Sequence, residues 1–202
     1  ASLSRVMLTC TGSEANEIAL RMARHCTGGQ GIIVTDFAYH GNTEAVAELG
    51  TGFMPEAQAT RRVRSFPIPD SYNTPQGVAP DQLADYYADA VKSAIDAFVA
   101  DGVGFAGLLI CPAFANEGLV NVPEGFLGKA LAHVRAAGGL FIADEVQGGF
   151  GRTGRRPIAW RSAPVQANGV ARPTMPCGSC SKPDARRKRS ISTGAWSTRG
   201  FS

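Results

Sequence analysis

Residues 139–147 read Gly-Leu-Phe-Ile-Ala-Asp-Glu-Val-Gln, an apolar run that ends in an acidic pair. Four apolar residues in a row between a glycine and a carboxylate are typical of a short strand buried in a sheet. Open sheets of α/β proteins build their ligand sites beyond the carboxyl ends of such strands. Asp144 is therefore the first candidate for a functional residue, and the glycine-rich stretch 148–154 that follows it predicts a loop.

The segments before this stretch alternate between strand-like and helix-like patterns. Strands are predicted at Val6–Cys10, Gly31–Thr35, Val63–Phe66, Phe105–Ile110 and Leu140–Ala143. Helices are predicted from Thr11 to the glycines at 28–29, and at Thr43–Leu49, Asp81–Ala100 and Pro123–Ala137. This alternation predicts an α/β fold with a mainly parallel sheet and helices on both of its faces.

Both ends of the first helix are marked in the sequence. Thr11 and Glu14 have the spacing of a capping box, and Gly28 is placed to end the helix. The inward face is predicted from apolar residues that recur at helical spacing, namely Ala15, Ile18, Ala19, Met22 and Cys26.

Composition divides the chain in two. With 44% hydrophobic and 18% charged residues, the 202-residue chain can bury a core, and its five cysteines form no disulfide framework, which is typical of a reducing compartment. Residues 1–154 carry 10 basic and 16 acidic side chains, whereas residues 155–202 carry 10 basic and 1 acidic. We expect 1–154 to be a folded domain and 155–202 to be a basic tail, either disordered or foreign to the domain before it.

Three motifs occur together in this chain: Thr-Gly-Ser-Glu-Ala-Asn-Glu at 11–17, Tyr-His-Gly-Asn-Thr at 39–43, and the acidic and glycine-rich stretch at 144–154. In this order the motifs resemble those of the class III aminotransferases, over roughly Leu3 to Gly154. The resemblance implies an incomplete large domain of a fold type I enzyme with pyridoxal 5'-phosphate as its cofactor. It also implies a small-molecule amino donor, a 2-oxo acid or aldehyde as acceptor, and a homodimer if the protein is complete.

The resemblance assigns one residue or more to most parts of the cofactor. Gly12 and Ser13 would hold the phosphate, because a helix amino end offers free N–H groups and a favourable dipole. Tyr39 and Val146 would cover the two faces of the ring, with His40 as a neighbour. The alternatives are an ordinary helix cap for Gly12 and Ser13, and a surface or hydrogen-bonding role for His40.

The ring nitrogen needs a carboxylate, because the negative charge keeps that nitrogen protonated. The protonated ring can then withdraw electrons from the substrate. The resemblance assigns this role to Asp144 and places Gln147 near the phenolic oxygen. A carboxylate at 144 or at Glu145 could instead cap the following turn. The loop around Glu117 corresponds to one that borders the cofactor in the family, although it begins with Cys111 where an acidic residue is usual; a plain surface loop is an equal alternative.

The family's Schiff-base lysine is not found, so no catalytic residue is predicted. The matching stretch, 170–176, contains no lysine, and the four lysines present are Lys92, Lys129, Lys182 and Lys188. We therefore expect an impaired enzyme, since the lysine also moves the proton between the substrate and the cofactor. We hypothesise that a shifted reading frame after Gly154 explains both the missing lysine and the change in composition.

Two other functions remain open: a non-catalytic remnant that binds cofactor or a dimer partner, and a basic-tailed nucleic-acid binder. The second rests on Arg186–Arg189, which has no aromatic interleaving, so we disfavour it. The Cys177–Cys180 pair lacks a second ligand pair, and no metal site is predicted.

No segment has the length of a membrane span, and we expect a cytoplasmic protein without a membrane partner. The sequence identifies neither the amino donor nor the acceptor, and it does not separate a transaminase from an aminomutase.

Overall fold

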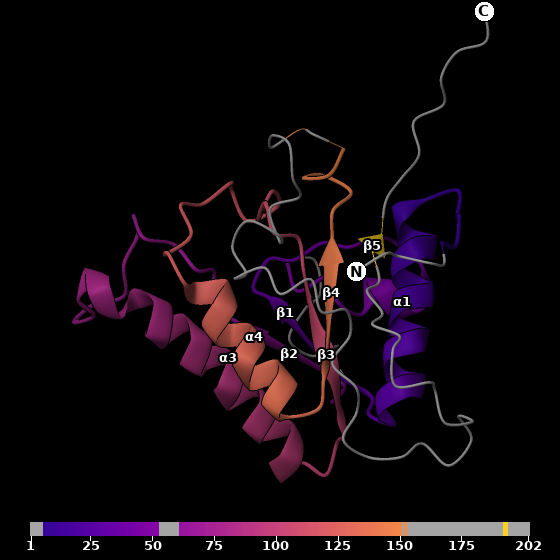
Figure 1. Ribbon diagram of the computed structural model, residues 1–202, viewed down its shortest axis with the longest axis horizontal. Coiled ribbons are helices and arrows are strands. Elements are labelled where there is room, and N and C mark those ends of the chain that lie inside the picture. The colour runs from indigo at the N-terminus through magenta and orange to yellow at the C-terminus, as the bar shows by residue number, and fades with distance from the viewer. Residues whose placement is uncertain (1–5, 53–60, 151, 153–191, 194–202) are drawn as a thin grey trace, which may run out of the picture.

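The computed structural model describes residues 6–52, 61–150, 152 and 192–193. Its centre is a sheet whose strands all run parallel, in the order β2-β1-β3-β4-β5 (Figure 1). The strands are β1 Gly31–Thr35, β2 Val63–Phe66, β3 Phe105–Ile110, β4 Leu140–Asp144 and β5 Ser192–Thr193. The predicted parallel α/β architecture is confirmed. The basic tail lies outside the described residues except for β5, so the expectation that it is disordered stays a prediction.

Helices cover both faces of this sheet, as Figure 1 shows. They are α1 Gly12–Thr27, α2 Glu44–Ala47, the 3-10 helix η2 Pro80–Gln82, α3 Leu83–Ala100 and α4 Phe126–Ala136. Helices α3 and α4 pack on one face against Ile33 and Leu108, whereas α1 packs on the other against Ile32 and Leu109. Successive residues of a strand therefore point into the two hydrophobic cores on opposite faces of the sheet. This is why β1 and β3 are buried throughout. Within the described residues, no helix has the length and apolar character of a membrane span.

Helix α1 has the predicted ends, but its buried face differs from the prediction. Thr11 and Glu14 form the capping box, and Gly28 ends the helix in the left-handed conformation, with φ 72°. The buried face consists of Asn16, Ala19, Leu20 and Ala23. Of the predicted face only Ala19 is fully buried, and Met22 is exposed. The prediction followed apolar residues alone and so missed a polar residue that is buried because it is hydrogen-bonded.

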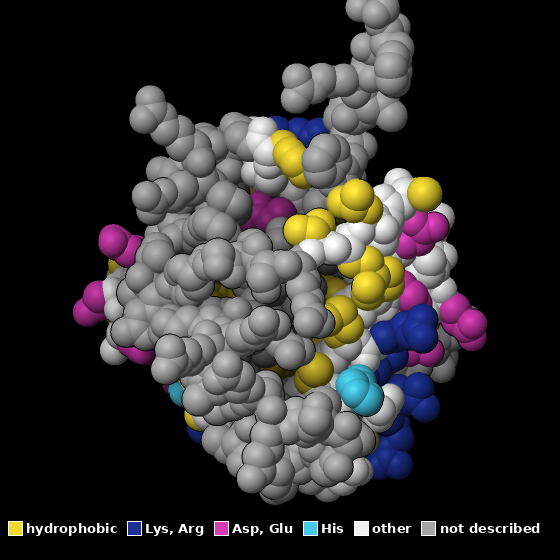
Figure 2. Space-filling view, turned by 45° about the vertical axis from the view of Figure 1, so that its right-hand side comes forward, with side chains coloured by type: hydrophobic (Ala, Val, Ile, Leu, Met, Phe, Trp, Pro, Cys, Tyr) yellow, Lys and Arg dark blue, Asp and Glu magenta, His cyan; other side chains and the backbone are white. Residues whose placement is uncertain are grey.

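The predicted strand at Val6–Cys10 is wrong. Residues 6–9 form no helix or strand, and Val6, Met7 and Leu8 are all more than two-thirds exposed. Met22 is exposed as well. Figure 2 shows hydrophobic side chains at the surface on one face of the molecule. A short apolar run predicts a strand only where a neighbouring strand pairs with it, and none of the described strands does so here.

The connection from β2 to α3 is held by a buried carboxylate, Asp70. Its side-chain oxygens accept hydrogen bonds from the backbone N–H of Tyr72, at 2.9 Å, and from the backbone and side chain of Asn73. The hydroxyl of Tyr87 on α3 donates to the backbone carbonyl of Asp70 at 3.2 Å. The bond from Tyr72 is the main reason why the pKa of Asp70 is lowered below its ordinary value of 3.8.

The lowered pKa of Asp70 predicts a pH-dependent loss of stability. A carboxyl group with a depressed folded-state pKa contributes its full stabilisation above pH 3.8 and loses it as the pH falls through the folded-state value. We expect the urea midpoint of the chain to fall in this acidic window, and Asp70→Asn to make that fall shallower. Asp81→Asn is the control, because the exposed Asp81 side chain has no hydrogen bond in the described structure. An equal effect of both substitutions would contradict the prediction.

Candidate functional site

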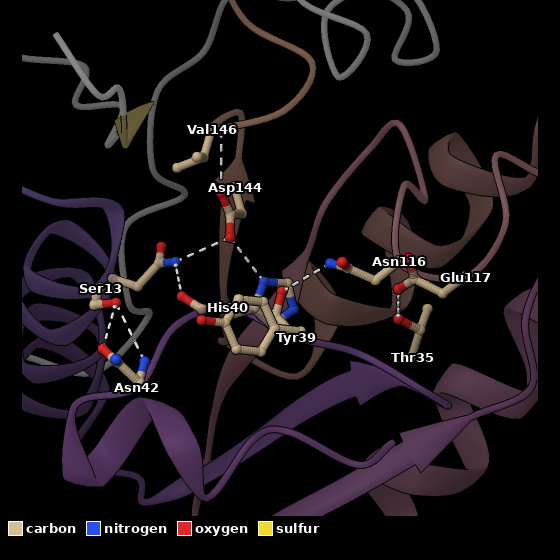
Figure 3. A network of polar contacts seen from close by, with 10 residues as sticks. Ser13, Thr35, Tyr39, His40, Asn42, Asn116, Glu117, Asp144 and Val146 are labelled. Atoms are coloured by element: carbon tan, nitrogen blue, oxygen red, sulfur yellow. Dashed lines mark hydrogen bonds and ion pairs between the residues drawn. The ribbon is translucent and has the colours of Figure 1, made fainter. Parts of the chain in front are cut away.

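The site lies at the edge of the sheet where β1, β3 and β4 end. Because these strands are parallel, the loops that follow them converge there, beside the amino end of α1 (Figure 3). The loops and the helix end surround a pocket of about 200 Å³. Its lining residues are Gly12, Ser13, Tyr39, His40, Gly41, Cys111, Asn116, Asp144, Val146 and Gln147. The structure therefore brings all seven predicted cofactor residues to one pocket.

Asp144 is the last residue of β4, and its side chain is buried, with only 5% of the residue exposed. Its Oδ2 accepts from Asn16 Nδ2 at 3.0 Å and lies 2.8 Å from His40 Nδ1. Its Oδ1 accepts from the backbone N–H of Val146 at 3.1 Å. A carboxylate offers about four acceptor positions, two on each oxygen. Within the part of the chain that the structure describes, three of these positions are used, so the position left for a ligand is on Oδ1. The bond from Val146 agrees with the alternative in which Asp144 also caps the turn.

His40 lies behind this carboxylate rather than at the surface. Its ring is buried, and Nδ1 faces Asp144 Oδ2 (Figure 3). A carboxylate oxygen can only accept, so Nδ1 carries the proton of this bond. The other nitrogen, Nε2, is buried and has no hydrogen-bond partner among the described residues. Of the two alternatives raised for His40, the structure shows the hydrogen-bonding one and excludes the surface one.

Asn16 belongs to the same cluster and was not predicted from the sequence. Its Nδ2 donates to Asp144 Oδ2 and, at 2.8 Å, to the backbone carbonyl of His40. One amide therefore ties α1 to β4 and to the loop after β1. The available signal was its position, because Asn16 precedes the buried Ala19 and Leu20 by three and four residues, and a polar residue in phase with a buried face needs a partner.

Removal of the Asn16 amide should destabilise the chain. Asn16→Ala leaves the carbonyl of His40 and one position of Asp144 Oδ2 buried without a donor, which costs about 1 to 3 kcal/mol of unfolding free energy. Asn42→Ala is the control, because the bonds of Asn42 to Ser13 are exposed to water and should contribute less than about 1 kcal/mol. Urea unfolding of both variants measures the difference, and equal losses would show that the buried cluster has no special weight.

The amino end of α1 forms the opposite side of the pocket. The capping box uses the backbone N–H groups of Thr11 and Glu14. Those of Gly12 and Ser13 make no hydrogen bond within the described structure, so they can receive an anion. A Cβ atom on Gly12 would lie 2.6 Å from a methyl group of Val146, which explains why only glycine fits between the helix end and the turn after β4.

The remaining walls of the pocket are formed by aromatic, aliphatic and sulfur groups. Tyr39 is 44% exposed, and Val146 is half-buried and held by Arg152, whose Nη1 donates to the carbonyl of Val146 at 2.9 Å. Cys111 follows β3 and is buried. Burial is the main cause that raises the pKa of its thiol, so the thiol is neutral near pH 7. The acidic residue expected at this position from the resemblance is thus replaced by an uncharged one.

The loop around Glu117 was predicted either to border the cofactor or to be a plain surface loop, and its residues differ in this respect. Asn116 lines the pocket, whereas Glu117 accepts a hydrogen bond from Thr35 outside the pocket lining. The described lysines lie elsewhere. Lys92 on α3 pairs with Asp96, and Lys129 on α4 pairs with Asp85. The other two lysines and the stretch 170–176 lie outside the described residues, as do the Cys177–Cys180 pair and the Arg186–Arg189 run.

Comparison with known proteins identifies the family. The family model for class-III aminotransferases matches residues 1–167 of the chain. The chain belongs to this family. Class-III aminotransferases are pyridoxal phosphate enzymes, so the predicted cofactor is confirmed at the level of the family.

Individual relatives and solved structures give the same result. The chain is 34% identical over 169 residues to an alanine–glyoxylate aminotransferase 2-like protein of Drosophila melanogaster, covering 81% of the chain and 34% of the relative. It is 32% identical to an ethanolamine-phosphate phospho-lyase homolog of Caenorhabditis elegans, covering 76% and 36%. Among solved structures, an Arthrobacter phospholyase in complex with phosphoethanolamine is 42% identical with TM-score 0.73, covering 82% of the chain and 39% of that protein. An omega-aminotransferase from Paracoccus denitrificans is 26% identical with TM-score 0.65, covering 78% and 37%. The chain spans about a third of the length of the curated relatives that it matches.

Proposed function

We propose that this chain is the cofactor-holding core of a pyridoxal-phosphate-dependent transaminase, which transfers an amino group between an amine or amino acid and a 2-oxo acid or aldehyde. The observation that supports this best is the arrangement of Asp144, whose carboxylate accepts from three donors and keeps one unused acceptor position among the described residues. A buried carboxylate with an unused acceptor position fits a protonated heterocycle. Family membership supports the reaction class.

The pocket residues fit the cofactor group by group. Asp144 would bind the ring nitrogen, while Asn16 and His40 fix its carboxylate. The N–H groups of Gly12 and Ser13 at the amino end of α1 suit the phosphate, because they make no other hydrogen bond in the described structure. When bound, pyridoxal phosphate supplies an aldehyde that captures amines and a ring that withdraws electrons from the substrate.

Three further residues line the same pocket and complete the proposed site. Tyr39 and Val146 would cover the ring faces, and Gln147 would lie near the phenolic oxygen. The neutral thiol of Cys111 adds no second charge beside Asp144.

Titration of the purified full chain with pyridoxal phosphate tests the proposal. We expect a saturable change in the cofactor's absorbance, with inorganic phosphate as a competitor because it occupies the same helix end. Borohydride reduction followed by peptide mapping then shows whether one lysine has reacted. Binding with a single modified lysine supports the enzyme, whereas binding without modification supports the remnant. The absence of saturable binding at millimolar cofactor would refute the proposed site.

A second candidate reaction is the elimination of phosphate from an amino-alcohol phosphate. One solved structure, at 42% identity, is a phospholyase bound to phosphoethanolamine, whereas several transaminase structures that match are 24–27% identical. The two reactions differ in their products. Release of inorganic phosphate from phosphoethanolamine by the cofactor-loaded chain would favour the lyase, and amino transfer to a 2-oxo acid would favour the transaminase.

Partners and location belong to the proposal as well. We infer a homodimer for the whole protein, and sedimentation of the chain with and without cofactor tests it.

Nucleic-acid binding stays the disfavoured alternative. A salt-dependent shift in the mobility of DNA or RNA on addition of the chain would favour it. A cytoplasmic location is proposed from cysteine usage, although matching aminotransferases of Arabidopsis thaliana, Pongo abelii and Homo sapiens are named mitochondrial. Fractionation of the cells that make the protein decides between the two.

A further inference from the structure

The loop that follows β3, residues 111–119, has a fixed and strained shape. Phe114 is 3% exposed and packs into the core beneath α3 and α4. Backbone hydrogen bonds close the loop from Phe114 N to Cys111 O and from Leu119 N to Phe114 O, both at 2.8 Å. Phe114 and Leu119 have φ values of 46° and 56°, in the left-handed region that side chains disfavour. Such strain persists only where the surrounding structure requires the shape, and it often marks a functional element.

Two neighbouring side chains in this loop reach the last residue of β1 and the segment that follows it. Asn116 Nδ2 donates to the backbone carbonyl of Tyr39 at 3.1 Å, and Glu117 accepts from the hydroxyl of Thr35 (Figure 3). Thr35 and Tyr39 lie at the two ends of a five-residue segment. The loop therefore bonds both ends of the segment that carries Tyr39.

The segment around Tyr39 has no regular secondary structure to fix it. Side chains from other elements bind its backbone: Thr51 accepts from the N–H of Ala38 at 3.0 Å, and Asn16 donates to the carbonyl of His40 at 2.8 Å. The carbonyl of Tyr39, between them, is bound by Asn116. The Tyr39 residue is 44% exposed, so the position of its backbone contributes to where its ring lies.

We infer that Asn116 is a positioning residue, which sets the direction of the Tyr39 ring by holding its backbone carbonyl. This inference rests on the proposed function, in which the Tyr39 ring covers one face of the cofactor. Asn116 also lines the pocket, at the place where the loop meets Tyr39. Its side chain is exposed and contributes little to the core, so the bond to Tyr39 is the described reason for an asparagine there.

Hydrogen exchange of the cofactor-free full chain tests the inference without any bound ligand. We expect Asn116→Ala to speed exchange in peptides that cover residues 36–43 and to weaken pyridoxal phosphate binding about threefold to tenfold, the range expected for one hydrogen bond. Asn121→Ala is the matched control. Asn121 lies in the same connection between β3 and α4, is exposed, and donates to Ser71 at 2.8 Å away from the pocket lining. It should change neither the exchange nor the binding.

A double-mutant cycle separates positioning from a general loosening of the loop. In a Tyr39→Ala background, where no ring remains to be aimed, Asn116→Ala should cause no further loss of cofactor affinity. An equal loss in both backgrounds would overturn the inference, as would unchanged exchange in 36–43. Failure of the unmodified chain to bind pyridoxal phosphate would refute the proposed function instead, and the exchange experiment would still decide whether Asn116 holds Tyr39.

Discussion

Asp144→Asn is expected to weaken pyridoxal phosphate binding by roughly 30- to 150-fold. The substitution removes a charge-assisted hydrogen bond to the ring nitrogen, and such bonds contribute about 2 to 3 kcal/mol. The introduced amide also conflicts with its surroundings, because the three groups around Asp144 are all donors. Either orientation of the amide points its own N–H group at a donor. We therefore expect a loss of unfolding free energy of about 1 to 3 kcal/mol as well.

The control for this substitution is Asp36→Asn. Asp36 directly follows β1 at the same edge of the sheet, but it does not line the pocket. Cofactor titration and urea unfolding of both variants separate the loss of binding from the loss of stability. Cofactor affinity within about threefold of the unmodified chain in Asp144→Asn, below the effect of one charge-assisted bond, would contradict the assignment of Asp144 to the ring nitrogen.

The sequence predicted the strands well because of the kind of sheet that they form. A strand covered on both faces needs apolar residues throughout, so β1 and β3 appear as short, almost wholly apolar runs. Val6–Cys10 shows the limit of this signal. It has the same apolar character, but whether a strand forms depends on a partner strand, which a local pattern does not reveal.

The site was predicted in part. Motifs at the carboxyl ends of strands and at the start of a helix identified Gly12, Tyr39 and Asp144, because parallel topology brings these positions together. The hydrogen bonds among them were not predictable. Asn16 and Asp144 are 128 residues apart in the chain, and nothing local in either segment shows that their side chains meet. Asn116 was missed for the same reason, because its partner is a backbone carbonyl and leaves no mark on the sequence.

Gly41→Ala is expected to destabilise the chain by roughly 2 to 6 kcal/mol and to weaken cofactor binding with it. Gly41 has a φ of 133°, which a residue with a side chain rarely adopts. An added Cβ would lie 2.4 Å from the hydroxyl oxygen of Ser13 and 2.8 Å from its Cα. The second atom is backbone at the start of α1, so no side-chain rotation relieves the clash. Backbone strain and overpacking each cost about 1 to 3 kcal/mol.

The clash at Gly41 should also reach the anion site, because the loop and the helix end are bonded together. Ser13 and Asn42 exchange two hydrogen bonds at 3.2 Å, so a displaced loop pulls on the helix end whose N–H groups suit the phosphate. Gly77→Ala is the matched control, since Gly77 has a φ of 81° but nothing within 4 Å of an added Cβ. It should cost only the backbone strain, about 1 to 2 kcal/mol, and leave cofactor affinity unchanged. Urea unfolding and cofactor titration measure both quantities. If the two glycine variants behave alike, the contact between Gly41 and Ser13 has no role in shaping the pocket.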